Sequence, residues 1–181
     1  MLEPARHESA RHESARHEES LRIQVGGLTR AELRTALRAG GVLLNTHAET
    51  LLDHPVFDLR DPEEVRIVER GVADLGLVDG ATLPEVYAGA HARGLSLCPP
   101  DAGPYLRLAW TSQADAPDTV LSAGRSPAGA LKVASAQLST DVEYPKGFYV
   151  RVVVGRLWLR GYRCDDEYLY EPGDRFAFRV G

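Results

Sequence analysis

The sequence predicts an α+β fold, with three short helices in the first half of the chain and an antiparallel, meander-like sheet in the second half. Two observations support this prediction. Three amphipathic segments each begin with a Thr that is followed three residues later by Glu, at Thr29, Thr46 and Thr82, and this spacing is typical of a helix capping box. Beyond residue 94, short runs rich in β-branched and aromatic residues alternate with Pro and Gly, which favours strands joined by turns.

Apolar residues recur on one face of each predicted helix, with the period of an amphipathic helix. They are Leu33, Ala36 and Leu37 in the first helix, Ala48, Leu51 and Leu52 in the second, and Leu83, Val86, Tyr87 and Ala90 in the third. We expect the helices to end at Gly40-Gly41, before Pro55 and at Gly94, because glycine and proline terminate helices.

Residues 61–76 fit two structures. The spacing of their apolar residues suits a helix, whereas the β-branched run with Gly71 inside it suits a strand, and we predict a strand there. Further strands are expected at residues 95–98, 105–110 and 130–135, followed by the C-terminal strands, the last of them at residues 175–180. Residues 112–129 are rich in Ala, Ser, Asp, Pro and Gly, which predicts a long mobile loop.

The chain divides into an arm and a single domain. Residues 5–20 repeat the pattern Ala-Arg-His-Glu-Ser and carry nothing apolar to bury, so residues 1–21 are predicted to be a disordered polar arm and residues 22–181 one α+β domain. His7, His12 and His17 recur every five residues. That period places them on different faces of a helix, which disfavours a preorganised metal site.

Composition excludes some function classes. The net charge of −5 on 181 residues disfavours wholesale binding to nucleic acid or anionic membranes. The chain has neither a secretory signal nor an apolar run long enough to span a bilayer, so we expect a cytoplasmic protein without membrane association. Cys98 and Cys164 form no disulfide framework or metal-ligand motif, and both are expected to be reduced.

The C-terminal segment predicts a β-hairpin with two distinct faces. We expect strands at residues 148–153 and 156–161, joined by a tight turn at Val154-Gly155. In that register Arg151 lies opposite Trp158 and Tyr149 lies opposite Arg160. The apolar face carries Phe148, Val150, Val152, Leu157 and Leu159, and the other face carries Tyr149, Arg151, Val153, Arg156, Trp158, Arg160 and Tyr162. The apolar set must leave water, so the Arg/aromatic set is expected to point outward.

Two interpretations of this outward face remain open. Cross-strand arginines and aromatic rings stabilise sheets that bind nothing. The same alternation is also typical of surfaces that contact an anionic or planar partner. The candidate binding residues are Tyr149, Arg151, Arg156, Trp158, Arg160 and Tyr162.

An acidic run, Asp165-Asp166-Glu167, follows the hairpin. Consecutive side chains of an extended segment point in alternating directions, so a turn is favoured over a cation site there. None of the sequence motifs of nucleophilic hydrolases, phosphate-binding loops, zinc proteases or dinucleotide-binding folds occurs in the chain. We therefore expect no cofactor and no metal, and favour a protein that is not an enzyme.

Two long runs resemble a known family. Residues 76–110, GLVDGATLPEVYAGAHARGLSLCPPDAGPYLRLAW, and residues 144–180, YPKGFYVRVVVGRLWLRGYRCDDEYLYEPGDRFAFRV, are similar to an uncharacterised family of small bacterial proteins. The resemblance covers most of residues 25–180, and the second run is its most specific part. It implies a bacterial, single-domain, cytoplasmic protein, and it carries no activity, substrate or catalytic residue.

These observations lead to one leading hypothesis and two alternatives. The leading hypothesis is a non-catalytic protein that binds another protein through the Arg/aromatic face of the hairpin. The first alternative is binding of single-stranded nucleic acid or a nucleotide by the same face. The second is a hydrolase or transferase centred near Asp165–Glu167, which requires a cleft with perturbed carboxylates there.

Overall fold

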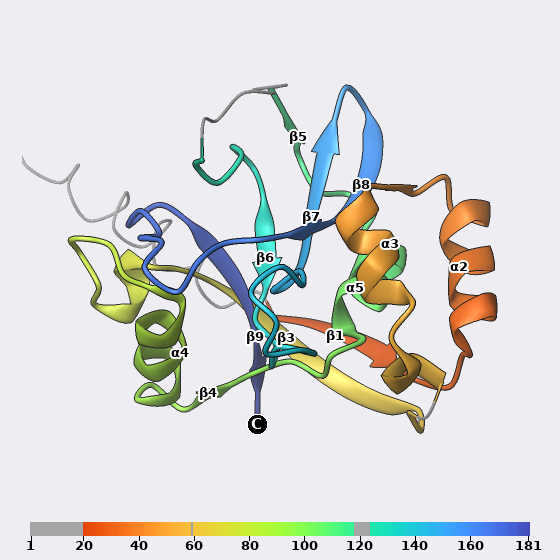
Figure 1. Cartoon of the computed structure of the whole chain (residues 1–181), viewed down its shortest axis with the longest axis horizontal. Helices are drawn as coiled ribbons and strands as arrows, with labels where there is room; N and C mark the ends of the chain where they lie inside the picture. Colours follow the sequence, from red (N-terminus) through yellow and green to blue (C-terminus); the bar gives the residue numbers. More distant parts are fainter. Residues whose placement is uncertain (1–19, 59, 118–123) are drawn as a thin grey trace, which may run out of the picture.

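The computed structural model describes residues 20–58, 60–117 and 124–181, which form helices on both faces of one mixed, nine-stranded sheet (Figure 1). The helices in this part of the chain are α2 (Arg30–Ala39), α3 (Thr46–Leu52), α4 (Leu83–His91) and α5 (Ala102–Ala109), with short 3-10 helices η1 (Pro55–Asp58) and η2 (Ala73–Leu75). The strands are β1 (Ser20–Val25), β2 (Leu43–Leu44), β3 (Glu63–Gly71), β4 (Leu95–Ser96), β5 (Asp115–Ala116), β6 (Leu131–Val133), β7 (Gly147–Val153), β8 (Arg156–Tyr162) and β9 (Arg175–Val180).

The strands lie in the order β1-β3-β9-β6-β7-β8-β2, with β4 beside β9 and β5 beside β7. The α+β prediction is confirmed, but the antiparallel meander is wrong because three strand pairs, β2–β8, β5–β7 and β6–β9, are parallel. The last strand, β9, lies between β3 and β6 in the middle of the sheet. Parallel pairs join segments that are distant in the chain, so local patterning gives no signal for them.

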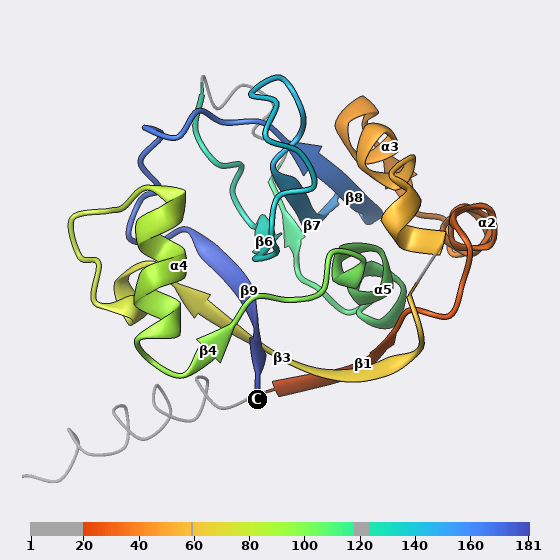
Figure 2. The same cartoon turned by 60° about the horizontal axis from the view of Figure 1, so that its bottom comes forward.

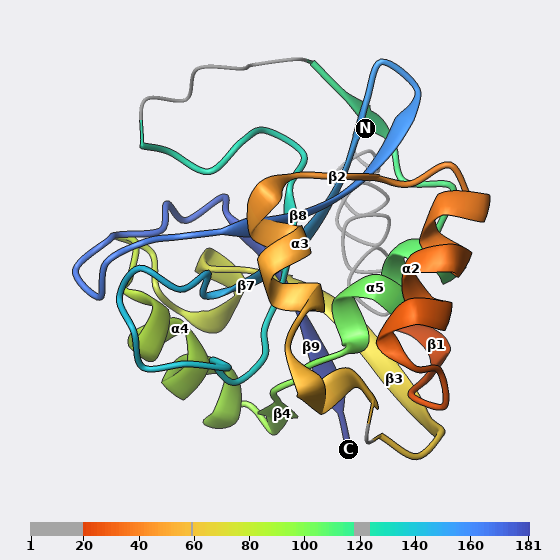
Figure 3. The same ribbon diagram turned by 45° about the vertical axis from the view of Figure 1, so that its right-hand side comes forward.

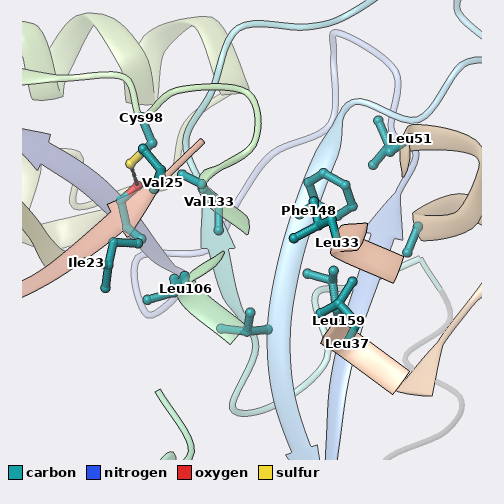
Figure 4. Packing of buried hydrophobic residues seen from close by; sticks show 14 of the residues in the cluster. Ile23, Val25, Leu33, Leu37, Leu51, Cys98, Leu106, Val133, Phe148 and Leu159 are labelled. Carbon is teal, nitrogen blue, oxygen red and sulfur yellow. Dashed lines mark hydrogen bonds between the residues drawn. The ribbon is translucent and has the colours of Figure 1, made fainter. Parts of the chain in front are cut away.

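Each face of the sheet has its own apolar core. Helices α2, α3 and α5 cover one face and α4 covers the other (Figure 2). In the first core, Phe148 and Leu159 face the leucines of α2 and α3 (Figure 4). In the second core, Phe176 and Phe178 pack with Val86 of α4 and with Tyr170.

Two of the three predicted capping boxes are confirmed. Thr29 caps α2 and Thr82 caps α4, each with the Glu three residues later bonded back to the cap. The third is wrong, because α3 is capped by Asn45, whose side chain accepts a hydrogen bond from the Ala48 backbone N–H. Asn and Thr are similar N-caps, so the choice between adjacent candidates depends on what else the Asn side chain contacts.

The strand predicted at residues 105–110 is wrong, because α5 occupies this segment and makes a fourth helix. Ala102 and Leu106 lie four residues apart on the buried side of the helix. A methyl group on Gly103 would stand 2.6 Å from the Phe148 Cβ, so glycine lets α5 lie directly against β7. This close contact is tertiary, and the apolar run alone suits either structure.

The remaining strand predictions are largely confirmed. β3 lies in the ambiguous segment, β9 spans the predicted range, and β4 and β6 lie inside theirs. The predicted loop of residues 112–129 contains β5, which pairs with β7. Most of the predicted polar arm, residues 1–19, falls outside the described residues, and the remaining two, Ser20 and Leu21, begin β1.

None of the described helices has the length and apolar character that crossing a membrane requires.

Candidate binding face on the C-terminal hairpin

The predicted hairpin register is confirmed. β7 and β8 pair with Arg151 opposite Trp158 and Tyr149 opposite Arg160. Val154 and Gly155 form the two-residue turn, with φ of 50° and 66°, and positive φ at both positions matches the right-handed twist of the strands. The apolar face of the hairpin lies in the first core, with α3 packed against β8 (Figure 3).

The prediction that the whole opposite face is exposed is wrong for Tyr149, Arg151 and Val153, which are all buried. Tyr149 is 7% exposed and Arg151 only 1%. The Arg151 guanidinium donates to the backbone carbonyls of Ala128, at 2.8 Å, and of Pro117, at 2.6 Å. The chain that follows α5 thus returns over this part of the sheet, so Arg151 holds that segment and is covered by it.

A second buried arginine, Arg107 of α5, holds the start of the same segment. It is fully buried and donates to the Gln113 side chain, at 2.7 Å, and to the Trp110 carbonyl. Burial lowers the pKa of Arg107 to about 10. Neither Arg107 nor Arg151 has an acidic partner within the described residues. Both arginines therefore donate to carbonyl and amide oxygens, and they anchor Trp110, Gln113, Pro117 and Ala128 on the sheet.

The rest of the predicted face remains accessible along β8. Arg156 is exposed, while Trp158 and Arg160 are half-buried, and we call these three residues the Arg-Trp stripe. The Arg160 guanidinium carbon lies 4.0 Å from the centre of the Trp158 ring, which is a cation–π contact. No carboxylate within the described part of the chain forms an ion pair with Arg156 or Arg160.

Beside the stripe, Tyr149 and Tyr162 of the same face line a cavity of about 450 Å³. Four tyrosines line this tyrosine cavity: Tyr149 and Tyr162 from the hairpin, and Tyr168 and Tyr170 from the segment that leads to β9. Tyr168 and Tyr170 meet edge to face, with ring centres 4.8 Å apart. Lys132, Cys164, Arg125, Arg163, Asn45, His47 and Asp165 are among the other residues of the wall.

Lys132 of β6 is the buried cation of this cavity. Its side chain is 4% exposed, and Nζ lies 3.0 Å from Asp174 Oδ1. The ammonium also lies over the rings of Tyr170 and Phe176, 5.1 and 5.3 Å from their centres. Burial lowers the pKa of Lys132, and Asp174 opposes that shift.

The phenols and the thiol beside Lys132 are neutral. Burial raises the pKa of Tyr162 and of Tyr170, and burial also raises the pKa of the Cys164 thiol. Cys164 Sγ lies 3.4 Å from the Tyr170 hydroxyl. The Tyr162 hydroxyl is buried with no hydrogen-bond partner in the described part of the chain. A thiol held neutral is a weak nucleophile, so the arrangement suits binding better than thiol chemistry.

Asn45 fixes the position of Tyr162. Its side chain exchanges two hydrogen bonds with the Gly161 backbone, 2.9 Å from the N–H and 3.0 Å to the carbonyl. A methyl group on Gly161 would lie 2.6 Å from the His47 carbonyl carbon, so the end of β8 reaches the start of α3 only as glycine. These contacts set the wall of the cavity next to Tyr162.

The acidic run after the hairpin forms a turn. Asp165 accepts from the Glu167 backbone N–H, and Asp166 pairs with the buried Lys146, at 3.1 Å. All three acidic side chains are exposed. Among the described residues, no group of three or more His, Cys, Asp and Glu side chains is placed to hold a metal ion.

Sequence reasoning missed Lys132, Tyr168 and Tyr170, because they are far from the hairpin in the chain. The sequence held one indication of Lys132, which is the scarcity of lysine. Lys132 and Lys146 are the only lysines among many arginines, and both are buried ion-pair partners of aspartates. Comparisons with protein-family models, curated proteins and solved structures found no significant match. The resemblance to uncharacterised bacterial proteins therefore stays a prediction.

Proposed function

We propose that this protein acts without catalysis, by binding another protein through the Arg-Trp stripe of the C-terminal hairpin. The observation that carries the proposal is that two arginines, Arg156 and Arg160, flank Trp158 on the same face of β8. Arg156 and Arg160 are both without an acidic partner in the described part of the chain, although the chain as a whole carries a net charge of −5. A local cationic stripe on an acidic protein favours an acidic partner surface.

The chemistry of the stripe supports a protein partner. Trp and Arg are the residues that contribute most often to binding energy at interfaces. Arg160 lies on the Trp158 ring at 4.0 Å, which holds both side chains in one arrangement before a partner arrives. Side chains that are already ordered lose less conformational entropy on binding.

The test is an affinity pull-down from a lysate of the source organism, with and without nuclease. The variant Arg156→Glu, Trp158→Ala should lose the specific partner that the wild type recovers. Arg38→Glu is the matched control, because Arg38 is exposed on α2 and lies outside the stripe. Recovery of the same proteins by the wild type and by the stripe variant would overturn the proposal. The buried Arg151 is unsuitable for this test, because its replacement disturbs the fold.

Single-stranded nucleic acid is the second candidate, since the stripe interleaves a ring with guanidiniums. The exposed surface available to stack bases is smaller than the sequence predicted. Tyr149 and Arg151 are covered, and one face of Trp158 is occupied by Arg160. With contacts from the two arginines of the stripe, log affinity should fall against log salt with a slope of about −1.4. Titration of an oligothymidylate at several salt concentrations measures this slope, and loss of partner recovery after nuclease treatment would favour this candidate.

A further inference from the structure

We propose that the tyrosine cavity is a small-molecule site, distinct from the Arg-Trp stripe, that binds a planar aromatic ring carrying an anionic group. The cavity has a volume of about 450 Å³, and ligand sites in proteins span roughly 300–1,000 Å³. Rings of Tyr149, Tyr168 and Tyr170 contribute to its wall, and such rings bind flat groups by stacking or by edge contacts.

One polar group of the cavity wall can form a hydrogen bond with a ligand. Tyr149 is 93% buried, being 7% exposed, and its side chain lines the cavity. Its hydroxyl makes no hydrogen bond within the described part of the chain and, unlike the Tyr162 hydroxyl, it is not buried. A ligand oxygen or nitrogen in the cavity can therefore reach it and form a hydrogen bond.

The ligand is not a cation. Tyrosine-lined cages bind quaternary ammonium groups through the faces of their rings. Here Lys132 already lies over the rings of Tyr170 and Phe176 and takes the place of such a ligand. These ring faces are therefore already occupied by a cation of the protein itself.

The charges of the wall favour an anion. The lining side chains include three cations, Lys132, Arg125 and Arg163, against the carboxylate of Asp165. Asp174 neutralises Lys132. The partners of the two arginines are exposed glutamates outside the cavity: Glu171, 3.9 Å from Arg125, and Glu143, which pairs with Arg163. Exposed pairs of this kind are weak, so an anionic group of a ligand can exchange with the glutamates.

The experiment is calorimetric titration of the full chain with two sets of probes. Adenosine and uridine 5′-monophosphates form one set, and 4-hydroxybenzoate and indole-3-carboxylate form the other. Adenosine, 4-hydroxybenzamide and benzyltrimethylammonium are the uncharged and cationic comparisons. We expect one anionic set to bind, with its uncharged counterpart weaker by about tenfold, as expected for the loss of a hydrogen bond to a charged group. The set that binds identifies the source as nucleotides or aromatic acids.

Two variants locate the bound probe. Tyr149→Phe removes only the unpartnered hydroxyl and should weaken binding by about two- to tenfold. Arg163→Gln, a surface change that leaves the fold intact, should weaken the anionic probe but not its uncharged counterpart. Tyr144→Phe is the matched control, because Tyr144 bonds to the Thr50 carbonyl and does not line the cavity.

Two results would overturn the proposal. The first is that neither anionic set binds. The second is an affinity that is unchanged in both Tyr149→Phe and Arg163→Gln, which would place the probe elsewhere. The stripe variant Arg156→Glu, Trp158→Ala should bind the probe as the wild type does, so failure of the proposed partner surface and failure of this site are distinguishable.

Discussion

Lys132 Nζ lies 3.0 Å from Asp174 Oδ1, and the two side chains are only 4% and 10% exposed. Asp174 also accepts the backbone N–H of Glu171 through its other oxygen, at 2.8 Å. The pair links β6 to the turn before β9, and its Lys132 forms part of the wall of the tyrosine cavity. Its charges must be satisfied within the protein, because water has little access to either group.

Removing one partner of this pair should lower the free energy of unfolding. Asp174→Asn keeps the shape of the side chain but leaves a buried ammonium without its counter-charge, at a cost of about 3–5 kcal/mol in the free energy of unfolding. Lys132→Met in the same chain should recover most of this loss, because no charge then remains buried. Urea unfolding of the wild type, the single variant and the double variant measures both effects. A double variant as unstable as Asp174→Asn would show that the charge is not the cause.

The same variant should change the dependence of stability on pH. Burial lowers the pKa of Lys132 and Asp174 opposes that shift, so removal of Asp174 lowers this pKa further. A lysine whose pKa is lowered on folding destabilises the protein below its folded pKa, and that penalty is relieved as the pH rises toward its unfolded value of about 10.4. The unfolding free energy of Asp174→Asn should therefore approach that of the wild type as the pH is raised toward that value. A constant difference across this range would contradict the assignment.

Asn45 should be the effective cap of α3. Its side chain makes three hydrogen bonds, to the Ala48 N–H and to both backbone groups of Gly161, so Asn45→Ala should cost about 2–3 kcal/mol at about 1 kcal/mol for each bond. Asn45→Asp keeps the two accepted bonds and should lose less. Thr46→Ala is the control and should change stability by less than about 0.5 kcal/mol. Equal losses at the two positions, measured by urea unfolding, would argue against Asn45 as the cap.

Replacing Val154 in the hairpin turn should stabilise the protein. This residue has a φ of 50° and is 76% exposed, so a β-branched side chain adopts a strained conformation there without burying its apolar surface. Val154→Asn should stabilise the protein by about 1 kcal/mol, because Asn tolerates this conformation. Val142→Asn is the comparison, since Val142 is 66% exposed and has no positive φ. Thermal unfolding should show a gain at Val154 and none at Val142.

Substitutions of Arg151 and Arg156 should have very different effects on stability, although both residues lie on the same face of the hairpin. Arg151→Gln loses two buried charged hydrogen bonds and should cost about 2–4 kcal/mol. Arg156→Gln changes an exposed side chain and should alter stability by less than about 0.5 kcal/mol. Urea unfolding separates the two roles. Similar small effects at both positions would mean that Arg151 does not hold Pro117 and Ala128 in place.

Asp101 should make stability depend on pH in the acidic range. Its side chain is 1% exposed, and its Oδ1 lies 3.0 Å from Arg60 Nε without the alignment of a hydrogen bond. Burial raises the pKa of Asp101 more than Arg60 lowers it. The folded state then holds its proton more tightly than the unfolded state, so this group's contribution becomes less favourable as the pH rises above about 3.9, the ordinary value for Asp.

The comparison with Asp101→Asn isolates this effect, because Asn keeps the size of the side chain and does not titrate. The Tm of the wild type relative to that of the variant should rise as the pH falls from about 7 toward the ordinary Asp value of about 4. A relative Tm that falls instead would show that the attraction of Arg60 exceeds the cost of burial.

Local chemistry made several elements predictable. Thr29 and Thr82 predict the starts of their helices because both hydrogen bonds of a capping box form within four residues of the chain. The register of the hairpin follows from Val154-Gly155, since a two-residue turn leaves one pairing that puts the apolar residues on one face. In each case the partners that determine the structure are neighbours in the chain.

The sequence by itself determined the α+β class, the helix starts at Thr29 and Thr82, and the two faces of the hairpin, because short-range hydrogen bonds and side-chain periodicity specify them. The tertiary structure alone decided that residues 102–109 form a helix, that Arg151 is buried, and that Lys132 meets the tyrosines of the cavity. The physical reason is that these outcomes depend on contacts between distant segments. Gly103 packs on Phe148, and the segment after α5 returns to cover Arg151.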